Sequence, residues 1–429
     1  MKKILVAASI CLGALFLFLA CQQKPPQAPA AAKAPSREKG TVVFLDTSVS
    51  MRGYFNVAPA AGAPLQQFIL ADLLGILAED NLTPVYLSPF GSEIASPQEV
   101  KSLRKWSFFE SLESKNTVYS QSETNLLGAF EGEAFVRHDV SIIISDGIQS
   151  SAEGSQNIAG FDTRIFNVIR KRSQTGTFLW LIGVKSKFRG IVYPERPCPD
   201  GIRRSFHYGG VRPIYVWIGS QDLGKGLGLV TKMVERIHSL LEPSETVRVA
   251  ALNFVHPPEI KMSMEPESSS SPIKRMKESA NGSEYLVKKT QQKEIDIPLA
   301  VSENKGKIQS EFWNMDWNLN IEVVSDKAKW ARTIKKNGNW HLVLNYNLIP
   351  GSNFFKGCMD DHQGRLRITA SSVAAIRQNP WWREWSTQND CRSEDAGKTL
   401  HLEKLSPMIE EPLHKKYDTA SIDVKFNRP

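Results

Sequence analysis

The residues with the clearest chemical potential lie at the end of a short apolar segment. Residues 42–45 are long enough for a strand buried on both faces, and the segment ends in Asp46, followed by Ser48 and Ser50. One carboxylate and two hydroxyls at alternate positions converge if the loop curls over the end of the strand, and such oxygens suit Mg²⁺, Mn²⁺ or Ca²⁺. The alternative is a strand followed by a serine-rich turn, because Asp and Ser are common turn residues.

Two later segments also place polar residues beside an expected strand or helix, and they favour the metal interpretation. Thr124 lies in a polar stretch before a helical segment, and Asp146 follows a second apolar strand at 141–144. Together with the D-x-S-x-S motif, these segments resemble the von Willebrand factor A domain over roughly residues 41–241. The resemblance implies a metal-ion-dependent adhesion site formed by Asp46, Ser48, Ser50, Thr124 and Asp146. It also implies that the hydroxyls bind a divalent ion, that the aspartates hold it largely through water, and that an acidic group of a protein partner fills an open position.

Two features of the chain depart from the family pattern. Val49 stands where the family usually has glycine, and residues 53–63 separate the motif from the first convincing helix, expected from Pro64 to Glu79. Strand and helix patterns then alternate, with a long irregular excursion expected at 186–212. The sequence therefore predicts an α/β domain over residues 41–243, with a doubly wound, mostly parallel sheet.

The pattern of the sequence changes after residue 243. Apolar and polar residues alternate with a period of two in 313–323 and again in 340–348. The second segment follows Asn337-Gly338, a strong hairpin dipeptide. Residues 244–429 are therefore expected to form a mainly β, sandwich-like domain.

Most of the ten tryptophans lie after residue 300, which raises glycan binding by the β domain as an alternative function. Three fall on apolar faces of expected strands and are assigned to the core: Trp313, Trp317 and Trp340. The other candidates adjoin a proline and charged residues and are expected on a binding surface: Trp381, Trp382 and Trp385.

The N-terminal residues 1–20 form a lysine-led apolar segment that ends directly before Cys21. This pattern predicts a signal peptide and resembles bacterial lipoproteins, in which Cys21 would become the acylated first residue; an ordinary secretory signal is the alternative. Residues 21–40 are rich in Pro and Ala and predict an extended tether. By family analogy, Gln22 favours the outer membrane, so we expect a lipid-anchored protein of the cell envelope.

The remaining cysteines are interpreted in an oxidising compartment. Cys358 and Cys391 share the expected β domain and are the predicted disulfide pair, which leaves Cys198 without a partner.

Charge and motifs restrict the function class. The formal net charge is +8, but the basic residues are scattered and accompany no nucleic-acid motif, so we expect no nucleic-acid binding. An aspartate at a strand tip with Mg²⁺ also serves phosphoryl transfer, as in haloacid-dehalogenase-like phosphatases, but those need a second carboxylate where this chain has Ser48. The sequence therefore predicts a binding protein rather than an enzyme, with a divalent cation, a protein partner and a membrane anchor.

Overall fold

The computed structural model of the chain describes residues 38–55, 72–100, 119–148, 158–194, 198–202, 204–252, 259–264, 272–279, 282–288, 290–304, 315–324, 329–349, 365–376, 380–410 and 416–427. The expected signal peptide, Cys21 and most of the expected tether lie outside these residues. In the part of the chain that is described, no helix has the length and apolar character needed to cross a bilayer.

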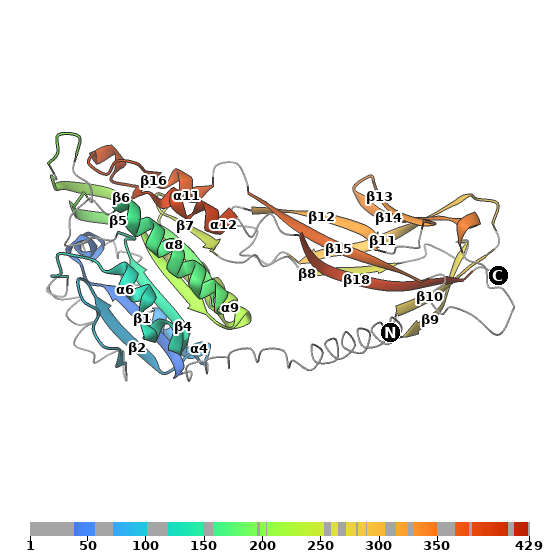
Figure 1. Cartoon of the computed structure of the whole chain (residues 1–429), viewed down its shortest axis with the longest axis horizontal. Coiled ribbons are helices and arrows are strands. Elements are labelled where there is room, and N and C mark those ends of the chain that lie inside the picture. The colour runs from blue at the N-terminus through green and yellow to red at the C-terminus, as the bar shows by residue number, and fades with distance from the viewer. Residues whose placement is uncertain are drawn as a thin grey trace, which may run out of the picture. The chain divides into compact units, whose positions relative to one another are not determined.

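A seven-stranded sheet of order β3-β2-β1-β4-β6-β5-β7 organises the first part of the chain (Figure 1). Its strands are β1 (Glu38–Asp46), β2 (Val85–Phe90), β3 (Gln98–Glu99), β4 (His138–Ser145), β5 (Phe178–Val192), β6 (Phe206–Ser220) and β7 (Thr246–Ala251). β1 pairs with β2 in parallel, whereas β4–β6, β5–β6 and β5–β7 are antiparallel pairs. The sheet is therefore mixed rather than mostly parallel, because β5 and β6 form a hairpin in place of a helical crossover.

Helices cover both faces of this sheet, as an α/β fold requires. The central strands have apolar middles, and alternate residues of β1 enter different cores: Val43 and Leu45 one, Val42 and Phe44 the other. The first core also receives α2 (Arg52–Phe55), α4 (Leu73–Glu79) and α9 (Leu223–Leu240). The second receives α6 (Leu126–Glu131), α7 (Glu133–Arg137) and α8 (Ile158–Gln174).

Three expectations about this region need correction. A short helix, α2, begins at Arg52 directly after the D-x-S-x-S motif, so helical structure starts within the gap expected at 53–63. The expected excursion at 186–212 is largely a continuation of the β5–β6 hairpin, which pairs as far as Val192 with Phe206 and buries Phe188. The sheet also extends past residue 243, because β7 pairs with β5.

Two further sheets form the second part of the chain, in the orders β12-β15-β18-β10-β9 and β13-β14-β11-β8. Their strands are β8 (Glu259–Met264), β9 (Ile273–Ser279), β10 (Gly282–Val287), β11 (Glu294–Asn304), β12 (Met315–Val324), β13 (Ala331–Lys336), β14 (Asn339–Asn345), β15 (Arg365–Ile376) and β18 (Lys416–Asn427), with a short 3-10 turn, η5 (Tyr346–Leu348). Ile297 and Leu342 from one sheet share a core with Ile368 and Val424 from the other, so the region is mainly β with two packed layers, as expected.

The predicted hairpin at Asn337-Gly338 is confirmed. It joins β13 to β14, and both residues have positive φ, 50° and 83°, which is the conformation that a two-residue type I′ turn needs. Trp340 is half-buried on β14, while the side chains of Trp313 and Trp317 lie outside the described residues.

A C-terminal segment, residues 380–410, packs against the seven-stranded sheet; we name it the docked segment. It contains α11 (Trp381–Glu384), β16 (Ser386–Thr387), η6 (Ser393–Asp395), β17 (Thr399–Leu400), η7 (Leu402–Leu405) and α12 (Ser406–Glu410). Trp381 Nε1 donates a hydrogen bond to the Val249 carbonyl of β7 (3.3 Å). Tyr215 of β6 shares a hydrogen bond of 2.7 Å with Thr399.

The tryptophans of the docked segment are buried, so the expectation that they form a binding surface is wrong. Trp381, Trp382 and Trp385 are 2%, 1% and 3% exposed, and they belong to the core that contains the second face of the sheet. Their charged neighbours Arg383 and Glu384 are exposed. Within the single turn of α11, the indole rings therefore face the sheet and the charged side chains face solvent.

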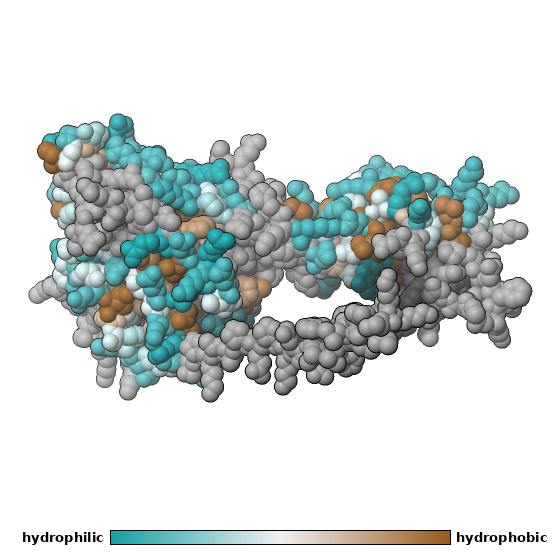
Figure 2. Space-filling model, viewed as in Figure 1, coloured by the Kyte–Doolittle hydropathy of each residue, from teal (hydrophilic) through white to brown (hydrophobic). Residues whose placement is uncertain are grey.

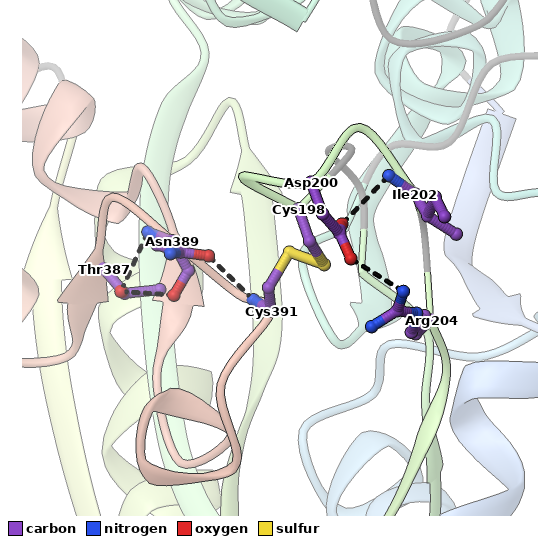
Figure 3. Close-up of a disulfide and its surroundings, with 7 residues drawn as sticks. All are labelled: Cys198, Asp200, Ile202, Arg204, Thr387, Asn389 and Cys391. Atoms are coloured by element: carbon purple, nitrogen blue, oxygen red, sulfur yellow. Dashed lines mark hydrogen bonds and ion pairs between the residues drawn. A yellow bond between two sulfur atoms is a disulfide. The ribbon is translucent and has the colours of Figure 1, made fainter.

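A disulfide joins the β5–β6 connection to the docked segment (Figure 3). Cys198 and Cys391 are bonded with a Cα–Cα distance of 5.5 Å. The predicted Cys358–Cys391 pair is therefore wrong, because Cys391 lies on the docked segment rather than in the β sandwich; Cys358 itself lies outside the described residues. Local bonds order both ends, including an ion pair between Arg204 and Asp200 (2.8 Å).

Candidate metal centre

The two candidate aspartates lie at one edge of the seven-stranded sheet. Asp46 is the last residue of β1 and Asp146 directly follows β4, the neighbouring strand. The Ser145 hydroxyl donates to Asp46 Oδ2 (2.8 Å), so the carboxyl ends of the two strands meet. Asp46 and Asp146 are 0% and 1% exposed. Two carboxylates are thus buried at the edge where open α/β folds place ligands.

The D-x-S-x-S motif folds back over the end of β1. The Ser48 backbone N–H donates to Asp46 Oδ1 (2.8 Å), and the hydroxyls of Ser48 and Ser50 are hydrogen-bonded to each other (2.9 Å). The short 3-10 helix η1 (Val49–Met51) turns the chain so that these alternate side chains lie on one side. The Ser50 side chain also acts on Asp146, because it lowers the pKa of that carboxyl. Three of the five predicted residues, Asp46, Ser48 and Ser50, therefore form one hydrogen-bonded chain, and Ser145 ties that chain to the start of the aspartate loop.

The fifth predicted residue, Thr124, lies on a loop fixed beside the motif. Gln121 of that loop forms a parallel bridge with Ser48, and its carbonyl accepts from the Val49 N–H (2.9 Å). Asn125 then caps α6 by accepting from a backbone N–H (2.9 Å). Thr124 is 2% exposed between these two anchors. The loop that carries Thr124 is thus held beside the motif through Gln121.

Burial and mutual repulsion disfavour the charged forms of the two aspartates. Burial, followed by the charge of the nearby Asp146, raises the pKa of Asp46 to about 7, although hydrogen bonds from Ser48 and Ser145 oppose the shift. Burial also raises the pKa of Asp146, although the Arg212 guanidinium opposes that shift. Both carboxylates can be ionised together at neutral pH only where additional positive charge is present.

The donor atoms fit a hard divalent cation. They are two carboxylates and neighbouring hydroxyls, which suit Mg²⁺ or Mn²⁺ rather than a soft metal. Asp146 Oδ2 is fully buried and has no hydrogen-bond partner within the described residues. An orphaned acceptor of this kind carries a cost that a cation would remove. In the described part of the chain, no group of three or more His, Cys, Asp or Glu side chains is placed to hold a metal. Hydroxyls would therefore have to complete the coordination shell of a cation at this centre.

Two residues of this centre were not singled out by the sequence reasoning. Ser145 could have been found, since it is a polar residue at the end of an apolar strand and adjoins Asp146. Arg212 Nη2 lies 4.0 Å from Asp146 Oδ2, and its side chain is 6% exposed. It is remote in sequence from both aspartates and gave no signal, because its position depends on the β5–β6 hairpin.

The comparisons with known proteins add no relative. No protein-family model, no curated protein and no solved structure matched the chain.

Proposed function

We propose that the chain is a lipid-anchored binding protein of the cell envelope, in which a von Willebrand factor A-like domain holds Mg²⁺ or a similar divalent cation. In this proposal the centre captures an acidic group of a protein partner. A bound divalent cation would supply an electrophilic position for a carboxylate oxygen of that partner. The chain's own carboxylates and hydroxyls would hold and orient that ion.

The observation that carries the proposal is the convergence of the predicted oxygens from separate parts of the chain. Hydrogen bonds link Asp46, Ser48 and Ser50 to Ser145, the neighbour of Asp146, although the motif and the aspartate loop are 99 residues apart in sequence. A serine-rich turn alone would account for the bonds within the motif. It gives no reason for a second buried carboxylate to face the same hydroxyls with an unpaired oxygen.

The alternative functions have less support. Glycan stacking was expected from Trp381, Trp382 and Trp385, but these rings are buried against the sheet and present no face to a sugar. A phosphohydrolase needs a second carboxylate two residues after Asp46, and the hydroxyl there is instead bonded to Ser50. We therefore propose a binding role without catalysis.

The test is capture of envelope proteins by the immobilised full chain, with Mg²⁺ or with chelator. The informative variant is Asp46→Asn, which keeps the side-chain volume but removes the charge. We expect a partner that is retained by the wild type in Mg²⁺ and released by chelator, and that Asp46→Asn does not retain.

Thr47→Val is the matched control. Thr47 lies between the two motif residues Asp46 and Ser48, is 5% exposed, and directs its hydroxyl away from the centre to the Phe90 carbonyl (2.8 Å). The variant removes a buried hydroxyl from the same loop without touching the centre, so it should retain the partner. Capture that ignores both chelator and Asp46→Asn, or that is lost equally in Thr47→Val, would contradict the proposal.

A further inference from the structure

The Arg212 guanidinium is a buried positive charge beside the Asp146 carboxylate. It belongs to β6, and its Nη2 atom lies 4.0 Å from Asp146 Oδ2, at the limit of an ion pair. Both side chains are almost completely removed from solvent. Burying a guanidinium is costly unless opposite charge compensates it, so its position next to Asp146 calls for an electrostatic explanation.

Aromatic rings, rather than a carboxylate, fix the position of this guanidinium. It lies over the Phe188 ring, 5.2 Å from the centroid, and it also interacts with the Tyr54 hydroxyl. The two rings meet edge to face at 5.0 Å. A Cβ at Gly53 would lie 2.1 Å from the Phe188 ring, so the glycine after the motif allows α2 to approach this ring closely. Packing of the β5–β6 hairpin against α2 therefore holds the Arg212 side chain towards the candidate metal centre.

One nitrogen of the guanidinium makes no hydrogen bond in the part of the chain that the structure describes. Arg212 Nη1 is buried and has no hydrogen-bond partner within the described residues, and the same is true of Asp146 Oδ2. A side chain held so rigidly, with an unpaired donor next to an unpaired acceptor, contributes mainly through charge. With both aspartates ionised, the cluster carries a charge of −1 with Arg212 and would carry −2 without it.

We propose that Arg212 is a built-in counter-cation of the candidate metal centre: its charge replaces part of the missing metal charge, so that the fold tolerates loss of the ion. The stabilising half of this proposal concerns the metal-free protein and stands on the Arg212–Asp146 geometry. The second half rests on the proposed metal function: because like charges repel, Arg212 weakens metal binding, and its removal should tighten it.

The experiment is a double-mutant cycle on the full chain in chelator, with Arg212→Met, Asp146→Asn and the combined variant. Methionine keeps an unbranched apolar stem over Phe188 and removes the charge. We expect Arg212→Met to raise the unfolding equilibrium constant strongly. For independent sites, the fold-change in the unfolding equilibrium constant of the combined variant would equal the product of the two single fold-changes. We expect it to be at least tenfold smaller than this product, which corresponds to a coupling of about 1.4 kcal/mol. Arg212→Lys, which keeps the charge, should recover most of the loss.

Mg²⁺ affinity, measured by titration calorimetry, gives a readout that a purely structural role would not move. Arg212→Met should bind Mg²⁺ several-fold more tightly than the wild type, and Arg212→Lys should resemble the wild type. If Arg212→Met does not fold in chelator, the combined variant decides: a folded product supports the proposal and an unfolded one overturns it.

The outcomes separate this inference from the proposed function. Coupling in chelator together with no Mg²⁺ binding by the wild type would reject the metal function and keep Arg212 as the counter-cation of Asp146. Normal Mg²⁺ binding by the wild type, with additive mutations and unchanged affinity in Arg212→Met, would reject the role of Arg212 and leave the metal function standing.

Discussion

Substitution of Gly183 by alanine tests how the docked segment is held against the sheet. Gly183 lies on β5, and a Cβ at this position would be 2.8 Å from the Trp385 ring and 2.9 Å from the Trp381 ring. Real Cβ contacts essentially never fall below 3.0 Å, so a ring or the backbone must move. Both rings are buried within a packed core, and neither has solvent into which it could swing.

The magnitude follows from the cost of overpacking. An extra methyl group in a well-packed core costs about 1–3 kcal/mol, and a lower entropy of the unfolded chain returns roughly 0.4–1 kcal/mol. We therefore expect a net loss of about 1–2 kcal/mol. In a cooperative unit of about 200 residues this corresponds to a fall in melting temperature of roughly 2–8 °C, measured by calorimetry.

Gly209→Ala is the matched control for this substitution. Gly209 lies on the paired strand β6, and no heavy atom is within 4 Å of the position of its added Cβ. Its melting temperature should equal or slightly exceed that of the wild type. Trp385→Phe should partly relieve the loss in Gly183→Ala, because the smaller ring leaves room for the methyl group. A Gly183→Ala protein as stable as the wild type, or an equal loss in Gly209→Ala, would refute the proposed packing.

Three other outcomes are expected. Peptide mapping without reduction should link Cys198 to Cys391, and a Cys358–Cys391 peptide would contradict the structure. Cys391→Ser should destabilise the protein by up to about 5 kcal/mol in the chain-entropy model, because the bonded cysteines are 193 positions apart in sequence. Mg²⁺ at a hundred times its Kd should stabilise the wild type by about 2.7 kcal/mol, a rise in melting temperature of roughly 5–11 °C. Asp46→Asn should show no such rise, and an equal rise in both proteins would exclude the metal site. Mass spectrometry of the mature N-terminus should find acylated Cys21, whereas a free N-terminus at another residue would reject the lipid anchor.

The local parts of the centre could be predicted because they follow from strand ends. Asp46 and Asp146 each lie at the end of an apolar run, and the alternating motif serines are placed to converge when the chain turns over the strand end. The alternating segments after residue 300 likewise identified the strands and the Asn337-Gly338 hairpin. In each case the deciding interactions lie within a few residues of the signal.

The errors arise where long-range packing overrides the local pattern. Trp382 and Trp385 adjoin charged residues, which is typical of a surface, but one helical turn directs the indoles inward, where Gly183 leaves space for Trp385 and its neighbour Trp381. Pairing Cys391 within the β domain assumed that chain proximity reflects spatial proximity, and the return of the docked segment breaks that assumption. Arg212 needed the same kind of information, since its burial depends on Phe188 across the β5–β6 hairpin.

Tyr215 connects the docked segment to the candidate centre. Its hydroxyl is hydrogen-bonded to Thr399 of the docked segment, and its ring lies under the aspartate loop, where a Cβ at Gly147 would be 2.7 Å away. Gly147 has a φ of +76°, so glycine is required there both for the backbone conformation and for the close approach of the ring. Asp146 directly precedes this glycine. Any shift of the docked segment that moves Tyr215 must therefore be accommodated next to Asp146. For this reason Gly183→Ala should weaken Mg²⁺ binding as well as stability, although Gly183 lies on a different strand from Asp146. Unchanged Mg²⁺ affinity in a destabilised Gly183→Ala protein would show that Tyr215 packs against the aspartate loop without influencing it.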